Sequence, residues 1–353
     1  MRYGKFLPEK GTIGFVAPSF GCNIEPYRSA FINAQKIWEQ QGYGFSFGPN
    51  AYEGCGIGIS NTPQKCAEEF NDWYAKEDVD VLISCGGGEL MCEILPYIDF
   101  EKIRNSEPKW FLGYSDNTNL IFLLATLCDT AAIYGPCAAA FGMEPWHDSL
   151  KDAMGILKGN IKSVHNYEQW EKEGLKTEDN PLEPYNVTEK FQLRTWTAEK
   201  GLSIPDDISK KTDEIIQMEG RLLGGCLDCL SILCGTKFDQ VEQFNEKYKE
   251  DGILWFLESC DLNPMGIRRA LWQLDEAGWL KYTKGFLIGR PYCYGEDFFG
   301  MDQYMAVLGI LSKVPVIMDV DIGHLPPMMP LVCGSKAKVK VEGNSIKIDM
   351  AYI

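Results

Sequence analysis

The sequence predicts an α/β protein: an N-terminal, mostly parallel α/β sheet domain with a nucleophile elbow, followed by a smaller mixed α+β domain. Short apolar runs alternate with amphipathic stretches through the first half, which is the pattern of strands and crossover helices in a parallel sheet. The chain ends instead in two alternating strands joined at Gly343-Asn344, which is a hairpin signal. The length of 353 residues fits about two domains.

The predicted domain boundaries are residues 1–160, a connector at 161–219, and residues 220–353. The connector differs from its surroundings because it carries prolines, many charges and the large side chains of Trp170 and Trp196 without clear periodicity. We expect this segment to be a loop excursion that covers a functional site.

The composition excludes several classes of protein. Hydrophobic residues make up 45% of the chain and aromatic residues 12%, which is enough for a sizeable core and argues against disorder. The formal net charge of −16 argues against nucleic-acid binding, which needs a basic face. An anionic substrate would therefore have to be met by a few local lysine or arginine side chains.

The 13 cysteines are scattered through a long chain whose first residues carry no secretion signal. We therefore expect a cytoplasmic protein with reduced thiols. No apolar run reaches the roughly 18 residues that a membrane-spanning helix needs, so no membrane association is expected.

In the first half, strands are predicted at residues 12–18, 45–47 and 80–84, and helices at 27–41 and 63–76. The first helix carries apolar residues at helical spacing, namely Phe31, Ala34, Ile37 and Trp38. The second helix begins with a proline, which suits a first helical position. The strand at 80–84 runs into the glycines at 86–88, and a further helix is expected to begin at 90–95.

The stretch from Trp110 to Cys128 has the layout of a nucleophile elbow. An apolar strand at 110–112 meets a sharp break at 113–115, and an apolar helix follows. Such a turn would present the Ser115 hydroxyl at a strand end, where the N–H groups and dipole of the helix favour an anion. The G-x-S-x-G pattern is incomplete because Asn117 replaces the second glycine, and a capping role for Ser115 is an equally good alternative.

In the second half, a glycine-rich segment leads into a helix, and strands and helices then alternate before the terminal hairpin. The predicted helices are 227–233 and 266–277, and the predicted strands are 252–257, 284–289, 314–319, 336–342 and 345–350.

A serine nucleophile needs a base, and the chain offers three histidines: His147, His165 and His324. His324 is the best candidate because it follows a predicted strand in a loop stiffened by Gly323 and by Pro326-Pro327. Glu258 ends a strongly apolar strand, so its carboxylate must find a partner. Orienting an imidazole and forming a salt bridge to an arginine, Arg268 or Arg269, are equally good possibilities.

Two further groups have alternative interpretations. The glycines at 86–88 could donate backbone N–H groups to an oxyanion, or simply form a tight turn. Cys226, Cys229 and Cys234 share one side of an apolar helix, which favours small buried thiols over a metal site. We predict no metal.

Several motifs, in order along the chain, resemble the serine LD-carboxypeptidase family, which includes muramoyl-tetrapeptide carboxypeptidases and microcin C self-immunity peptidases. They are residues 11–19, Gly87-Gly88, Gly113-Tyr114-Ser115-Asp116, Tyr134-Gly135-Pro136, residues 220–225, residues 233–236, Leu257-Glu258 and Gly323-His324.

The resemblance implies a Ser-Glu-His triad of Ser115, Glu258 and His324, with the backbone N–H groups of Gly87 and Asp116 lining an oxyanion hole. It also implies a homodimer without metal or cofactor. Gly86 stands where muropeptide-cleaving members often carry arginine, and Cys226 replaces a common asparagine, so the substrate stays open.

The expected activity is hydrolysis of an amide near the C-terminus of a muropeptide-like peptide. The alternatives are cleavage of a peptidyl-nucleotide antibiotic and, from another class, non-catalytic peptide binding on the same scaffold. We expect Gly88, Trp170 and Trp196 to contact the substrate, because aromatic side chains in an irregular excursion suit stacking on a ring. Simple anchoring of the long loop by the two tryptophans is an equally good alternative.

Overall fold

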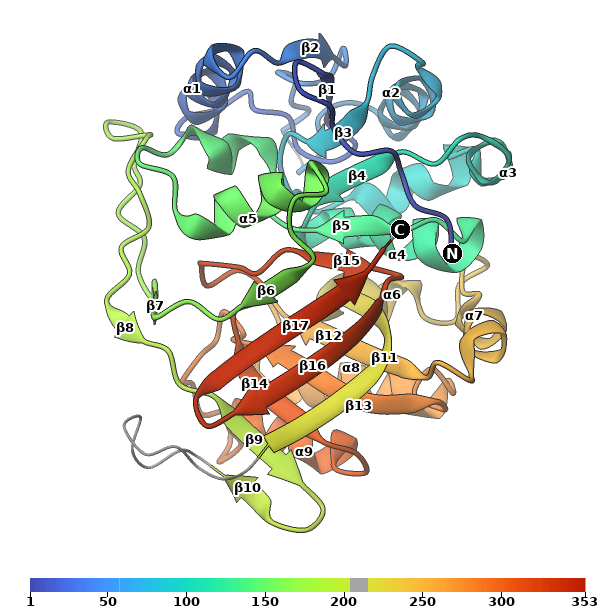
Figure 1. The fold of residues 1–353 in the computed structure, drawn as a ribbon, viewed down its shortest axis with the longest axis vertical. Coiled ribbons are helices and arrows are strands. Elements are labelled where there is room, and N and C mark those ends of the chain that lie inside the picture. The colour runs from blue at the N-terminus through green and yellow to red at the C-terminus, as the bar shows by residue number, and fades with distance from the viewer. Residues whose placement is uncertain (57, 204–214, 353) are drawn as a thin grey trace.

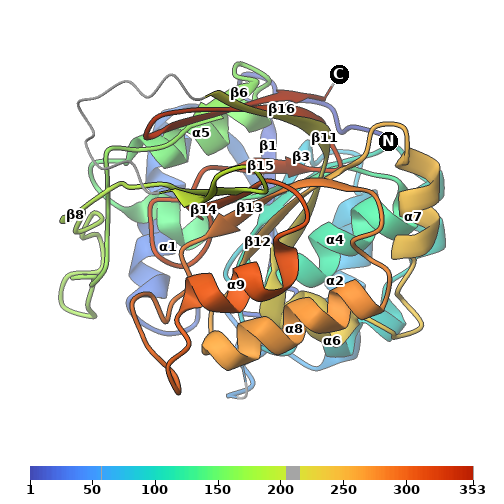
Figure 2. The same ribbon diagram turned by 90° about the horizontal axis from the view of Figure 1, so that it is seen from below.

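The computed structural model describes residues 1–56, 58–203 and 215–352. The chain forms two sheets with flanking helices, which lie one above the other in Figure 1. The two termini lie near each other at the junction of these halves in both views (Figures 1 and 2). The mixed α/β class predicted from the sequence is confirmed.

The first sheet has six strands in the order β15-β5-β4-β3-β1-β2. Their bounds are β1 Thr12–Val16, β2 Gly44–Phe47, β3 Val81–Ser84, β4 Trp110–Gly113, β5 Ala132–Tyr134 and β15 Leu331–Cys333. All neighbours are parallel except β15, which pairs antiparallel with β5. Strands β3 and β4 are buried along their whole length, as expected for apolar runs covered on both faces.

The helices of this half are α1 Tyr27–Gln40, α2 Pro63–Ala75, α3 Phe100–Asn105, α4 Thr118–Cys128 and α5 Asp148–Leu157, with 3-10 helices η1 Met91–Tyr97, η2 Ser115–Asn117 and η3 Ala138–Gly142. α1 buries Phe31, Ala34 and Trp38, which the sequence spacing predicted. α2 begins as expected, with Pro63 at its first turn and the Thr62 side chain accepting from the Lys65 N–H. The helix expected from 90–95 is the 3-10 helix η1, which contains Pro96.

The second sheet has nine strands in the order β10-β9-β14-β13-β12-β11-β16-β17-β6. The parallel centre consists of β11 Ile215–Cys226, β12 Ile253–Glu258, β13 Thr283–Gly289 and β14 Val316–Val320. The antiparallel strands are β6 Ser163–His165, β9 Arg194–Thr197, β10 Gly201–Ser203, β16 Lys336–Glu342 and β17 Ser345–Ala351. The predicted hairpin of β16 and β17 alternates between buried and outward positions.

The helices of the second half are α6 Leu227–Leu233, α7 Val241–Tyr248, α8 Pro264–Glu276 and α9 Gln303–Leu311. Figure 2 shows α8 and α9 side by side against one face of the sheet.

The segment 161–219 contains more regular structure than the sequence led us to expect. Its strands β6, β9 and β10 belong to the second sheet, and β7 Gln169–Trp170 pairs with β8 Glu189–Lys190 in a separate ribbon. These strands have two to four residues each, too short to create a visible period. The second half is therefore shorter in sequence but recruits edge strands from the connector. The boundaries at 160 and 219 stay a prediction.

The two halves share one core at their junction. Strand β15 crosses from the C-terminal half to pair with β5 of the first sheet. The Phe122 ring of α4 stacks on Trp279 at 5.1 Å, and the Cys226 N–H donates to the Thr118 hydroxyl at 2.9 Å. The carboxyl ends of β4, β5, β11 and β12 therefore meet in one place, where side chains from both sheets can combine.

Candidate active site

Ser115 occupies a strained turn between β4 and α4. Its φ of +62° lies in the left-handed region, which a non-glycine residue seldom adopts. Ser115 begins the short helix η2, and its N–H faces the Tyr134 hydroxyl at 3.3 Å. Strand, sharp turn and helix reproduce the predicted elbow layout, and backbone strain of this kind is concentrated at functional sites.

His324 connects Ser115 to Glu258. Its Nε2 lies 2.9 Å from the Ser115 Oγ, and its Nδ1 lies 2.8 Å from the Glu258 Oε2. Because a carboxylate only accepts hydrogen bonds, the Nδ1 must carry a proton when the pair is formed. This leaves the Nε2 lone pair of a neutral imidazole facing the serine hydroxyl, which is the arrangement of a general base.

Glu258 is completely buried and accepts two hydrogen bonds. The Tyr134 hydroxyl donates to Oε1 at 2.5 Å, and His324 occupies Oε2. Burial alone would raise the pKa of Glu258, but the His324 charge and these hydrogen bonds hold that pKa below its usual value. Glu258 thus pairs with the histidine, whereas Arg268 donates to the Met305 carbonyl.

The contact between His324 and Glu258 also determines the protonation of His324. Burial lowers the affinity of the imidazole for a proton, but the Glu258 charge outweighs it and raises the pKa of His324 well above 6.5. The loop geometry depends on Gly323, which has a φ of +106°. A side chain there would bring its Cβ within 2.6 Å of the Glu258 Oε2, so only glycine fits before the histidine.

Gly87 and Asp116 flank Ser115 with backbone groups. A Cβ on Gly87 would lie 3.1 Å from the Ser115 Oγ, which shows how closely this backbone approaches the hydroxyl. The Asp116 carboxylate is buried and accepts from the Met91 N–H at 2.8 Å and the Asn119 amide at 2.9 Å. The Asp116 N–H lies in the first turn of a helix, where such groups have no partner within the helix.

A cavity of about 280 Å³ opens beside His324. Its lining includes Gly87 and Tyr114 from the first half, and Glu171, Lys176 and Tyr185 from the connector. The Tyr114 ring lies 5.2 Å from the imidazole, measured between ring centres. A ligand in this cavity would lie against the His324 imidazole.

Three residues expected to contact substrate do not line this cavity. Gly88, with φ +119°, packs against Ser19. Trp170 is only 4% exposed, because its ring lies under the Arg290 guanidinium at 4.8 Å. Trp196 is part of β9 and pairs in register with Val316. This packing favours the anchoring alternative for the two tryptophans, and contact of Gly88, Trp170 and Trp196 with substrate stays a prediction.

Sequence reasoning assigned no role to several residues of the site. Tyr134 ends β5 and belongs to one of the family motifs, and a tyrosine at the end of a buried strand is a usable signal for a polar partner. Glu171, Lys176 and Tyr185 gave no signal, since their positions depend on the path of an irregular segment.

Of the three cysteines of the α6 region, Cys229 lies close to the serine turn. The Cys229 Sγ lies 3.7 Å from the Ser115 carbonyl oxygen, and Cys226 caps α6. In residues 1–56, 58–203 and 215–352, no cluster of three or more His, Cys, Asp or Glu side chains could hold a metal ion. Over the same residues, no helix combines the length and the apolar character needed to cross a membrane.

Two sheets that meet at a strained serine turn define a two-domain α/β architecture. The chain belongs to the LD-carboxypeptidase family, because residues 13–135 match its N-terminal domain and residues 219–339 match its C-terminal domain.

Known relatives cover 80% or more of the chain at low identity. The microcin C7 self-immunity protein MccF of Escherichia coli is 22% identical over 97% of this chain and 94% of its own length. A protein of Rickettsia conorii that carries a provisional carboxypeptidase name is 26% identical over 80% of this chain and 74% of its own.

The solved structure of an MccF-like protein from Bacillus anthracis covers 99% of this chain and all of its own, with 21% identity and a TM-score of 0.80. MccF in complex with aspartyl sulfamoyl adenosine aligns with a TM-score of 0.79 at 20% identity, covering 99% of each chain. These likenesses establish the shared fold.

Proposed function

We propose that this protein is a cytoplasmic serine peptidase of the LD-carboxypeptidase type, which hydrolyses an amide near the C-terminus of a muropeptide-like substrate. The observation that carries the proposal is the chain of contacts from the Ser115 hydroxyl through His324 to Glu258, at 2.9 and 2.8 Å.

In the proposed reaction, the His324 Nε2 takes the Ser115 proton as Oγ attacks the amide carbon. The resulting oxyanion accepts hydrogen bonds from the Gly87 and Asp116 backbone N–H groups. His324 then donates its proton to the leaving amine, and the amide C–N bond breaks to leave an ester on Ser115. Water, deprotonated by the same imidazole, hydrolyses the ester and regenerates the free serine.

Glu258 stabilises the imidazolium that forms in each half of this reaction. Its negative charge and its hydrogen bond to Nδ1 keep the ring oriented, and Tyr134 holds the other carboxylate oxygen. All of these steps use side-chain and backbone groups of this chain. We therefore propose that no metal or cofactor is required, so activity should survive dialysis against EDTA. We also propose a homodimer, as in the family.

A second candidate is cleavage of a peptidyl-nucleotide antibiotic. The observation in its favour is the likeness to MccF, whose solved structures include complexes with adenosine monophosphate and with sulfamoyl nucleosides. The same triad would serve, since both reactions break an amide-type bond. A non-catalytic peptide-binding protein would have no use for a general base in contact with a strained serine.

The two activities are separated by incubating the protein with a muropeptide tetrapeptide ending in D-Ala and, in parallel, with a peptidyl-adenylate analogue. Mass spectrometry then detects loss of D-Ala or release of the nucleotide part. Ser115→Ala is the matched control and should process neither. Turnover by this variant equal to wild type would remove Ser115 from the reaction, and no turnover of either compound would count against the proposed substrates.

A further inference from the structure

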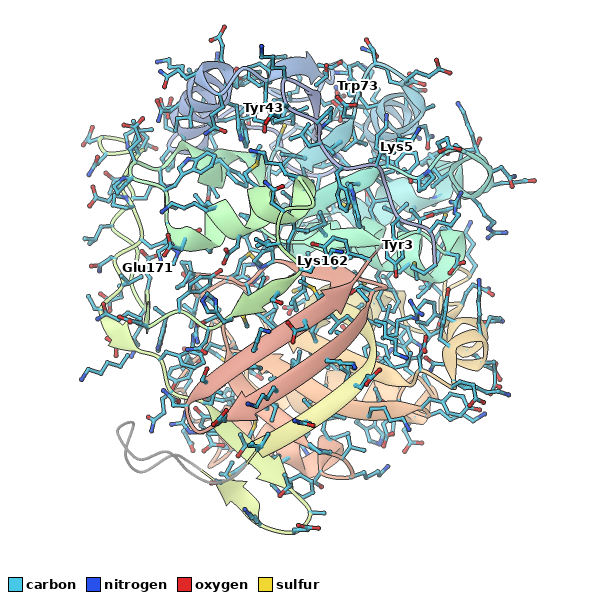
Figure 3. All side chains as sticks on the ribbon, viewed as in Figure 1. Tyr3, Lys5, Tyr43, Trp73, Lys162 and Glu171 are labelled. Atoms are coloured by element: carbon cyan, nitrogen blue, oxygen red, sulfur yellow. The ribbon has the colours of Figure 1, made fainter. Side chains whose placement is uncertain are left out.

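Besides His324 itself, the cavity contains one basic side chain among the described residues that line it. Lys176 comes from the stretch between β7 and β8, and the acidic residues of the lining are Glu171 and Glu183. Glu171 is labelled in Figure 3, where it lies on the connector beside β7. In a chain with a net charge of −16, a lysine that lines a cavity at the candidate active site calls for an explanation.

Both carboxylates of the lining are already engaged by the connector itself. The Glu171 carboxylate accepts from the Asn186 N–H, and Glu183 accepts from the Asn180 amide. The Glu171 N–H donates to the Pro326 carbonyl at 2.7 Å, which ties this wall of the cavity to the His324 loop. Each acid therefore has a hydrogen-bond partner within the connector.

Lys176 is in a different situation. Burial lowers the pKa of its amine, and the charge of Glu171 opposes this only in part. No ion pair joins Lys176 to another residue within 1–56, 58–203 or 215–352. A partly desolvated ammonium with unused donors gains free energy when an anion supplies the missing hydrogen bonds.

The rest of the lining suits the uncharged body of a ligand. Tyr114 and Tyr185 provide aromatic walls, while Pro136, Ala140 and Met328 are apolar. Aromatic and apolar walls around a few polar groups are typical of small-molecule sites. Gly87 and His324 also line the cavity, so a ligand held there lies next to both residues.

We propose that Lys176 is a substrate-binding residue that pairs with an anionic oxygen group, a carboxylate or a phosphate, on the part of the substrate that enters this cavity. The inference rests on the proposed function, because it takes the cavity beside His324 as the substrate site. It adds that the substrate is anionic. The shared chemistry is a terminal oxyanion, which a peptide C-terminus and a nucleotide phosphate both carry.

The test compares charged and uncharged versions of the same probes by calorimetry, with Ser115→Ala as the background to prevent turnover. The probes are adenosine monophosphate against adenosine, and a D-Ala-terminated tetrapeptide against its C-terminal amide. Lys176→Met should lower the affinity for one charged probe by about tenfold or more and leave the affinity for its uncharged counterpart unchanged. This is the effect expected when a charge-assisted hydrogen bond is lost. Which probe responds identifies the anion.

Two other variants complete the experiment. Lys172→Met removes an exposed lysine from the same segment and should leave all four affinities unchanged. Lys176→Arg keeps the charge and should retain the preference for the charged probe, which covers the case in which Lys176→Met does not fold. The proposal would be overturned if Lys176→Met and the protein with the native lysine had equal affinity for both charged probes. It would also be overturned if neither charged probe bound to the protein with the native lysine.

Failure of this inference is distinguishable from failure of the proposed function. Labelling of Ser115 by a fluorophosphonate in the otherwise unaltered protein reports on the triad alone. A labelled Ser115 together with charge-independent binding would retain the peptidase and reject Lys176 as its anion contact. Absent labelling with charge-dependent binding at Lys176 would leave the anion site and reject the serine mechanism.

Discussion

At His324, two opposing contributions determine when the imidazole is neutral. Burial favours the neutral ring, but Glu258 at 2.8 Å favours the protonated one and raises the pKa above 6.5. A general base must be neutral to accept the Ser115 proton. Activity should therefore increase with pH through the raised pKa of His324, and its acidic limb should lie above pH 6.5.

Glu258→Gln removes the negative charge while keeping the size of the side chain. We expect kcat to fall by roughly 10²–10⁴, because the imidazolium formed in the transition state loses its counter-charge. The acidic limb of the pH–rate profile should also move to lower pH, since the pKa of His324 is no longer raised. Both quantities come from initial rates measured across the pH range.

A purely structural role for Glu258 gives a different pattern. In that case the variant would melt at lower temperature while kcat and the position of the acidic limb stayed as in wild type. Circular dichroism melts of the two proteins supply the control.

The residues of the candidate site differ in how far sequence could predict them. Ser115, Glu258 and His324 each follow a predicted strand, so their type and position already marked them, and the resemblance joined them into one triad. Tyr134 ends a buried strand, which signals a polar partner without identifying it, and Lys176 acquires its position from three-dimensional contacts. Nothing in the local pattern around either residue encodes the partner it meets.

Among the elements, the segment that leads to His324 contacts a buried arginine, Arg290. Arg290 follows β13, is 1% exposed, and donates to the Asp319 carbonyl at 2.9 Å and to the fully buried Asp321 carboxylate. The other Asp321 oxygen accepts from the Tyr167 N–H at 2.8 Å. Because these contacts lie on both sides of the strand end that leads to His324, we assign Arg290 as a positioning residue for the imidazole.

Arg290→Lys keeps the charge but loses the planar fork that reaches two acceptors at once. We expect kcat to fall by about tenfold with little change in KM, because the imidazole is less well placed while the cavity is intact. Steady-state kinetics at a temperature where the variant is fully folded measure both constants. Arg268→Lys, whose native side chain donates to the Met305 carbonyl of α9, is the matched control.

If Arg290 only stabilises the fold, Arg290→Lys will lower the melting temperature and leave kcat unchanged. That result would limit the role of Arg290 to the packing between the connector and the second sheet.

The elements themselves show what the sequence pattern could and could not predict. Helix α6 and strand β16 appear with the predicted bounds, because each has enough residues to display its period. The three-residue strands β6 and β15 were missed. Each is defined by pairing with a distant partner, and a segment of that length carries no period of its own.

On the scale of the whole molecule, the two halves are joined by a continuous core. Phe122 stacks on Trp279, β15 completes the first sheet from the C-terminal half, and the Tyr134 hydroxyl crosses to Glu258. The candidate site is assembled only when both halves are folded and docked. Loosening this junction should therefore affect the entire molecule.

Differential scanning calorimetry should show a single unfolding transition for the full chain. Phe122→Ala, which empties a fully buried position at the junction, should lower the free energy of unfolding by about 3–5 kcal/mol and still give one transition. Two separate transitions in wild type, or a variant in which only part of the heat absorption shifts, would show that the halves unfold independently.

The central claim is that Ser115 is the nucleophile, and covalent labelling with a fluorophosphonate followed by peptide mass spectrometry tests it most directly. We predict a single adduct on Ser115, formed slowly or not at all in His324→Ala, because that variant lacks the base that removes the serine proton. Labelling of other residues with Ser115 unmodified, or an equal labelling rate in His324→Ala, would contradict the assignment of this serine as the activated nucleophile.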